Sequence, residues 1–187
     1  MKSIFPLLIA AVLGTAPLLA EEGIKSGLQV GDTFIPFTVQ DVTGPRKGNS
    51  LCYGCAFGKH SVINIQAKTI NAELVSVLKQ LDSLVDDAGS IKGESKHAFL
   101  VYLTEEPDLA EKELAALAKA EGLKNIPLTI YDELSGPPPY KLADAADVTV
   151  MMWNDTKVTT NLAFSKAGMN AVAVNQILSS AKTHLAN

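Results

Sequence analysis

The sequence predicts an α/β domain built on a mixed sheet, with central parallel strands, a C-terminal antiparallel hairpin and flanking helices. Two observations predict it. Short apolar runs of strand length alternate with longer segments whose apolar residues recur at helical spacing, which is the order of parallel strands joined by helical crossovers. Near the C-terminus, two further strand-like runs are separated by residues 154–157, whose Asn, Asp and Thr are typical of a hairpin turn.

Residues 1–20 are predicted to be a secretory signal that is not part of the fold. Lys2 gives a positive start, residues 4–13 form an apolar stretch, and Glu21 follows the expected cleavage site at Ala20. A membrane-spanning helix needs about 20 apolar residues, more than this run supplies. We therefore expect an exported protein, periplasmic or secreted, with one domain over residues 21–187.

Composition excludes several classes of partner. The net charge is −4 and basic residues do not cluster, so neither nucleic acid nor an anionic membrane is an expected partner. The chain has only two cysteines, which excludes a scaffold held together by many disulfides. The hydrophobic core must therefore hold the fold.

The apolar pattern predicts the elements in chain order. Residues 23–58 are rich in turn residues and are expected to run in extended form over a sheet edge, with Phe34, Phe37 and Val39 packing inward. A linker with three prolines, residues 136–139, precedes the hairpin. Strands are predicted at 62–67, 98–103, 126–131, 148–153 and 158–164, and helices at 71–87 (ended by Gly89), 107–121 (ended by Gly122) and 174–185.

Three motifs lie around these elements. Residues 30–32 with Pro36-Phe37 and residues 41–44 form a lead-in. Residues 58–65 enter the first central strand, and residues 127–132 with 141–155 form a closing half. Together they resemble the thioredoxin-like superfamily, and more closely its redoxin and peroxiredoxin-type branch. The resemblance implies a thioredoxin-like fold from about Val30 to the C-terminus.

The chain departs from that family at its usual active site. In the family, redox cysteines follow the first central strand, where the amides of the next helix lower the thiol pKa. Here that place holds residues 67–70, which contain no sulfur. The cis-proline expected before Thr149 is replaced by Val148, so we expect an ordinary trans peptide bond there. The activity therefore cannot be inferred from the fold alone.

Cys52 and Cys55 form a CxxC motif that precedes the first central strand. Their spacing allows a disulfide, which an exported protein would tend to keep oxidised. As a staple the bridge would be weak, because the chain-entropy relation gives roughly 2 kcal/mol for so short a loop. Cys52 and Cys55 are thus candidate catalytic residues of a thiol-disulfide oxidoreductase that exchanges disulfides with other exported proteins without a cofactor. By analogy with other CxxC motifs, Cys52 would attack and Cys55 resolve, with Lys59 and His60 as nearby positive charges. Cys52 could equally be the buried member of the pair, because no local helix N-terminus is evident from the sequence.

Two alternatives remain open. In the first, the chain is a non-catalytic binding or structural module and the bridge is a clasp, which buried sulfurs would favour. In the second, Cys52, Cys55 and His60 bind zinc or copper, although a structural zinc site needs four ligands and His97 or His184 would have to complete it. The preferred interpretation contains no metal.

Overall fold

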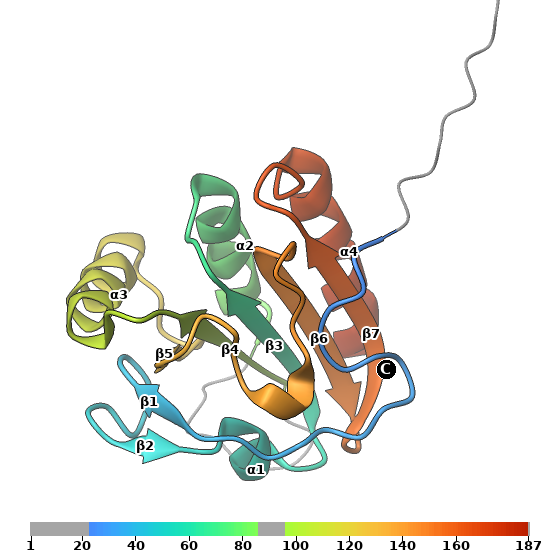
Figure 1. Ribbon diagram of the computed structural model, residues 1–187, viewed down its shortest axis with the longest axis horizontal. Helices are drawn as coiled ribbons and strands as arrows, with labels where there is room; N and C mark the ends of the chain where they lie inside the picture. Colours follow the sequence, from blue (N-terminus) through green and yellow to red (C-terminus); the bar gives the residue numbers. More distant parts are fainter. Residues whose placement is uncertain (1–22, 86–95, 187) are drawn as a thin grey trace, which may run out of the picture.

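The computed structural model describes residues 23–85 and 96–186, which form one mixed sheet with helices packed on it (Figure 1). The strands lie in the order β2-β1-β5-β4-β3-β6-β7. The elements are β1 (Val39–Asp41), β2 (Ser50–Leu51), α1 (Tyr53–Phe57), β3 (Ser61–Ala67), α2 (Ala72–Asp82), β4 (Lys96–Leu103), α3 (Pro107–Glu121), β5 (Leu128–Tyr131), the 3₁₀ turn η1 (Pro138–Tyr140), β6 (Val148–Asn154), β7 (Lys157–Phe164) and α4 (Ala171–Ala186).

The sheet is mixed, as the sequence predicts. β3, β4 and β5 run parallel, while β6 pairs antiparallel with β3 and forms a hairpin with β7. The apolar runs of β3 and β4 are buried on both faces because they are central strands. The hairpin turn is tight, with Asp155 and Thr156 at positive φ.

The two faces of the sheet are covered differently (Figure 1). The helices α2, α3 and α4 pack on one face and share its main core cluster with β3, β4, β5 and β6. Two right-handed crossovers that step the same way across a sheet put their helices on the same face, which places α2 beside α3. The other face is covered by residues 23–37, α1 and η1, around an aromatic cluster that contains Tyr53, Phe99 and Trp153.

The N-terminal part differs most from the prediction. Residues 23–58 do not only run over the sheet, since β1 and β2 extend it beyond β5 and α1 follows them. Phe34 and Val39 are buried as expected, and Phe37 is partly buried. These elements are too short to produce an apolar periodicity, which is why the sequence pattern did not predict them.

The ends of two helices also differ from the prediction. The helix expected over 71–87 ends at Asp82, whose carboxylate accepts the backbone N–H groups of Lys124, Asn125 and Ile126. These bonds tie the end of α2 to the loop before β5. The C-terminal helix begins at Ala171, earlier than expected, because Asn170 accepts the N–H groups of its first turn.

Two sequence predictions fall on other parts of the chain. The expected signal at 1–20 and the helix stop at Gly89 lie outside the described residues. Among the described helices, none combines the length and the apolar character needed to cross a membrane.

Candidate redox site

The CxxC motif lies on α1, at the amino end of the central strand β3. Cys52 and Cys55 form a disulfide with an S–S distance of 2.06 Å and a Cα–Cα distance of 5.2 Å. Cys52 is the N-cap of α1, and its Sγ accepts the backbone N–H of Cys55 at 3.1 Å. Cys55 is exposed to solvent and Cys52 is partly buried. The sulfurs are therefore paired, as predicted, and Cys55 is the more exposed residue of the pair.

Between the cysteines, Tyr53 anchors α1 to the lead-in. Its hydroxyl donates to Asp41 Oδ2 at 2.9 Å, and the same buried carboxylate accepts the N–H groups of Gly44 and Arg46 at 2.7 Å each. Burial raises the pKa of the Tyr53 hydroxyl well above its usual value, and the neighbouring Asp41 carboxylate raises it further. The phenol therefore stays protonated and keeps donating across the neutral range.

Gly54 provides a second anchor, through close contact with an aromatic ring. A Cβ at this position would overlap the ring of Phe34. That ring stacks on Trp153, with the ring centroids 5.2 Å apart. The middle of the CxxC motif is thus packed against the lead-in and, through Phe34, against β6.

Lys59 and His60, the basic residues beside the motif, contact residues of other elements. Lys59 Nζ lies 3.4 Å from Asp155 in the β6–β7 turn, and both side chains are largely exposed. His60 Nδ1 lies 3.0 Å from Nε2 of the buried His97, whose ring stacks on Phe57. Lys59 and His60 thus contact residues other than the cysteines, and their role as nearby positive charges stays a prediction.

The metal alternative finds no support in this geometry. Within residues 23–85 and 96–186, no group of three or more His, Cys, Asp and Glu side chains is placed to hold a metal ion. His184, on α4, contacts the Thr159 hydroxyl at 3.2 Å, and burial lowers its pKa. The three histidines and the two cysteines are therefore not brought together as one ligand set.

The usual thioredoxin-type position lies at the other end of β3 and is filled by polar side chains. Thr69 Oγ1 donates to the carboxylate of Asp147, and the Lys68 N–H donates to the Asp147 carbonyl at 2.9 Å. Asn71 caps α2 by accepting the N–H of Leu74 at 2.9 Å. All described peptide bonds are trans, the bond before Val148 included.

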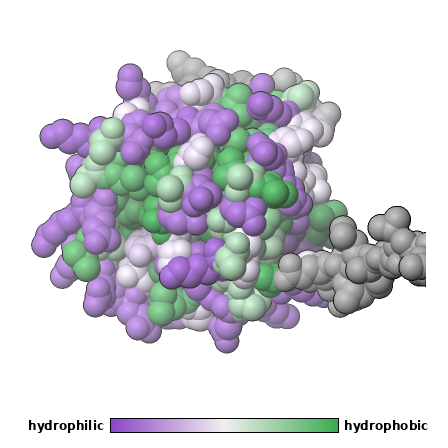
Figure 2. Space-filling view, turned by 90° about the horizontal axis from the view of Figure 1, so that it is seen from above, coloured by the Kyte–Doolittle hydropathy of each residue, from purple (hydrophilic) through white to green (hydrophobic). Residues whose placement is uncertain are grey.

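The CxxC motif is therefore displaced by the length of a strand. β3 has seven residues, and at about 3.3 Å per residue its two ends are roughly 20 Å apart. Seen from above, the end of the sheet at which α2 begins shows hydrophilic and hydrophobic side chains interspersed (Figure 2). The helix α1, which carries the CxxC motif, lies at the opposite end (Figure 1).

Sequence reasoning found the cysteines but missed the residues that position them. In the sequence, Asp41 and Gly44 stand out only as part of the lead-in motif, although an Asp that bonds a backbone N–H a few residues later is a common turn signal. The contact between Gly54 and Phe34 depends on the path of the lead-in and has no signal in the sequence.

Comparison with known proteins identifies the fold. Neither a scan of protein families nor a search of curated proteins finds a match. Solved structures do match. An uncharacterized conserved protein of Geobacillus kaustophilus is 14% identical, with a TM-score of 0.59, over 89% of this chain and 88% of that chain. A peroxiredoxin-like protein of Aquifex aeolicus is 12% identical, with a TM-score of 0.53, over 87% and 91%.

A third match is a Chlorobium tepidum protein assigned as the thiol:disulfide interchange protein DsbE. It is 16% identical, with a TM-score of 0.55, over 82% of this chain and 99% of that chain. The fold is thioredoxin-like. This confirms the fold expected from the sequence motifs, and the thioredoxin-like fold here combines an unusual CxxC position with a polar cluster at the usual one. At such identities the likeness concerns the fold, and the chemistry has to be argued from the site.

Proposed function

We propose that this chain is an exported thiol-disulfide oxidoreductase that acts through Cys52 and Cys55 on other exported proteins. The observation that carries the proposal is an accessible disulfide, since Cys55 is exposed and Cys52 is only partly buried. A purely structural bridge would gain nothing from this exposure and, over so short a loop, would add only roughly 2 kcal/mol. The thioredoxin-like fold of the peroxiredoxin-like and DsbE proteins is consistent with this chemistry.

The proposal assigns the two cysteines their roles from the greater exposure of Cys55. A partner thiolate attacks Cys55 Sγ, a new S–S bond forms between them, and the electron pair of the broken bond leaves on Cys52 Sγ. The Cys55 N–H, already 3.1 Å from that sulfur, stabilises the departing thiolate, and a stabilised thiolate leaves faster. A second partner thiolate then displaces Cys55 from the mixed disulfide. The partner ends oxidised, and the protein ends as a dithiol reduced by two electrons.

This assignment reverses the one expected by analogy with other CxxC motifs. Because forward and reverse exchange pass through the same mixed disulfide, Cys55 is also the attacking thiol when the reduced protein acts on a partner disulfide. Cys52 is then the resolving thiol. The buried packing of Tyr53 and Gly54 keeps α1 in place, so the two sulfurs stay within reach of each other.

The proposal is tested by trapping the mixed disulfide. Cys52→Ser should accumulate a mixed disulfide on Cys55 when incubated with glutathione disulfide or a scrambled, disulfide-bonded protein, because no second sulfur releases it. Cys55→Ser should form the same adduct much more slowly, because Cys52 is less accessible. Intact mass measurement under acid quench reads out both variants.

Two results would contradict the proposal. Equal, slow adduct formation in both variants would show that neither sulfur exchanges in the folded protein. Faster trapping in Cys55→Ser than in Cys52→Ser would restore the roles expected from other CxxC motifs and refute the exposure argument.

The clasp remains the second candidate, and a specific observation favours it. Both residues between the cysteines are buried and held by side chains of the lead-in. Tyr53 donates a hydrogen bond to Asp41, and Gly54 packs against the Phe34 ring. In a helix that is held in this way, the disulfide would serve only to close the first turn. In that case wild-type thiols would react with a maleimide after reduction, but no disulfide would be transferred to glutathione at a measurable rate.

A further inference from the structure

β7 is an edge strand, and the chain's own lead-in covers only its first part. The Gly31 N–H donates to the Val158 carbonyl and the Val158 N–H donates to the Asp32 carbonyl, both at 2.9 Å. The Phe34 N–H donates to the Thr156 carbonyl at 2.7 Å. The backbone groups of this part of β7 are therefore already paired with the lead-in.

In the remaining part of the edge, the Asn161 side chain donates to the Ser26 and Leu28 carbonyls at 2.7 Å each, but the outward backbone groups are open. The Phe164 carbonyl points toward β6, where it accepts the N–H of Asp147 at 2.8 Å. Because successive residues of a strand direct their backbone groups to opposite sides, Ala163 and Asn161 direct theirs away from the sheet. Within the described ranges, no backbone group pairs with these outward N–H and C=O groups. Such an edge is a template for another strand.

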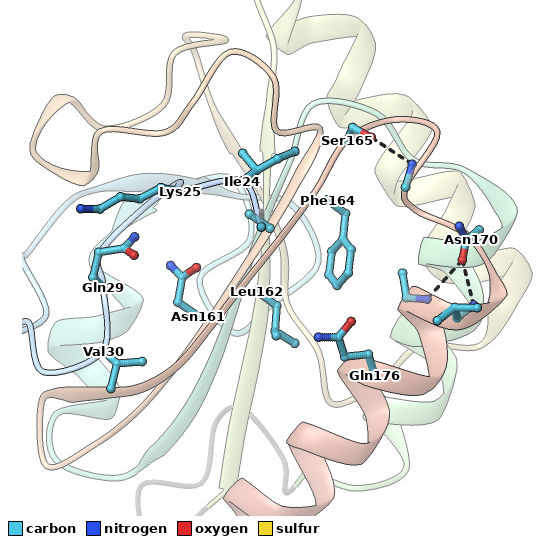
Figure 3. Close-up of a pocket in the computed structure, with 15 residues that line it drawn as sticks. Ile24, Lys25, Gln29, Val30, Asn161, Leu162, Phe164, Ser165, Asn170 and Gln176 are labelled. Carbon is cyan, nitrogen blue, oxygen red and sulfur yellow. Dashed lines mark hydrogen bonds between the residues drawn. The ribbon is translucent and has the colours of Figure 1, made fainter. Parts of the chain in front are cut away.

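A groove of about 950 Å³ surrounds this open edge. Figure 3 shows Ile24, Lys25 and Gln29 on one side of β7, and Leu162, Phe164 and Gln176 on the other. Its rim also carries Val30 and Val172, which are 65% and 73% exposed. Among the described residues these are the two most exposed of the large hydrophobic side chains. The groove thus has apolar side chains, mixed with polar ones, on each side of the unpaired backbone groups.

We propose that this groove binds an extended peptide segment of another protein, which adds a strand along Asn161 and Ala163 of β7. The backbone of such a segment would pair with the edge, and its side chains would alternate between the two sides of the groove. Among the described residues that line the groove, Lys25 is the one that carries a charge. The segment that fits best therefore has apolar residues at alternate positions and an acidic residue facing Lys25.

The same charge argues against a second copy of this chain as the occupant. In a symmetric pairing, the strand facing Lys25 would be β7 itself. The β7 sequence from Lys157 to Phe164 contains a lysine and no carboxylate, so it has no group to pair with Lys25. The proposal does not depend on the disulfide chemistry of Cys52 and Cys55.

The test is selection of a displayed random heptapeptide library on the purified protein, followed by synthesis of the enriched peptide with a fluorescent label. We expect enriched sequences to alternate apolar residues and to contain Asp or Glu. In anisotropy titrations, Lys25→Glu should weaken binding about fivefold, the size of a surface ion pair that is lost and reversed. Val172→Asp should weaken it about tenfold or more by replacing an apolar side chain of the groove with a charged one.

A matched control and a backbone readout separate strand addition from other binding. Leu109→Asp likewise replaces an exposed aliphatic side chain with an aspartate. Leu109 lies on α3, is 49% exposed and is outside the groove, so this variant should leave the affinity unchanged. Amide hydrogen exchange at Asn161 and Ala163 should slow when the peptide binds.

Three results would overturn the proposal. The first is a selection without an alternating, acid-containing pattern. The second is a peptide whose affinity is unchanged by Lys25→Glu and Val172→Asp, or whose binding leaves the amide hydrogen exchange of Asn161 and Ala163 unchanged. The third is a dimer in light scattering that Val172→Asp converts to a monomer, because a second copy would then occupy the edge.

Discussion

Replacing Tyr53 with Phe tests how the CxxC helix is held. The change removes one hydrogen bond to the buried Asp41 carboxylate, which keeps its two bonds from Gly44 and Arg46. A hydrogen bond to a charged group contributes about 1.5–3 kcal/mol, and the two remaining bonds favour the lower end of that range. For a domain of this size, such a loss lowers Tm by about 3–12 °C.

The assay is urea unfolding followed by the fluorescence of Trp153, the single tryptophan, which is buried against Phe34. Tyr131→Phe is the matched control, because its hydroxyl makes no hydrogen bond with the described part of the chain and its ring lies edge-on to Phe37. A loss of less than about 0.5 kcal/mol for Tyr53→Phe, no larger than for Tyr131→Phe, would refute the anchoring argument.

The stability difference between wild type and Tyr53→Phe should depend on pH. The pKa of Tyr53 is raised in the folded state, while an unfolded tyrosine titrates near pH 10. The unfolded wild-type chain therefore loses its proton first, and wild-type stability falls as pH rises above about 10. Tyr53→Phe lacks this loss, so the stability difference between the two proteins should narrow there. A difference that stays constant up to about pH 11 would contradict the assigned environment.

Two further predictions concern packing and acid sensitivity. Gly54→Ala should lower stability by about 1–3 kcal/mol because the new methyl group overlaps the Phe34 ring, and the same change should be nearly neutral in a Phe34→Ala background. A stabilising effect in the wild-type background, read from the urea midpoint, would show that helix propensity outweighs the overlap. For His184, burial lowers the pKa, so the unfolded chain binds a proton first as pH falls below about 6.5 and stability is lost. His184→Asn should lose less stability than wild type between about pH 7.5 and 5.5, and an equal loss in both proteins would contradict this.

The central part of the fold could be predicted because its signals are local. The apolar run of β4 and the amphipathic spacing of α3 each decide an element without reference to the rest of the chain. Gly122 ends α3 in the left-handed conformation that a glycine at this point predicts. The hairpin turn at Asp155 and Thr156 is likewise decided by a few adjacent residues.

The site could be predicted only in part, because its geometry depends on residues distant in sequence. The disulfide between Cys52 and Cys55 follows from spacing, but the bond from Tyr53 to Asp41 depends on how the lead-in crosses the sheet. The pairing of His60 with His97 requires the register in which Val62 lies beside His97 on β4. The open edge of β7 arises from strand order, which no short motif encodes.

The most direct test of the proposed function is the reduction potential of the Cys52–Cys55 couple. It is measured by equilibrating the folded protein in glutathione buffers and trapping free thiols, with a Cys52→Ser/Cys55→Ser double variant as the blank. An exposed exchange site predicts a value within the range of known exchange catalysts, roughly −120 to −270 mV, reached rapidly. A value below about −300 mV would indicate a structural clasp and contradict the proposal, and thiols that react only after unfolding would contradict the exposure on which the proposal rests.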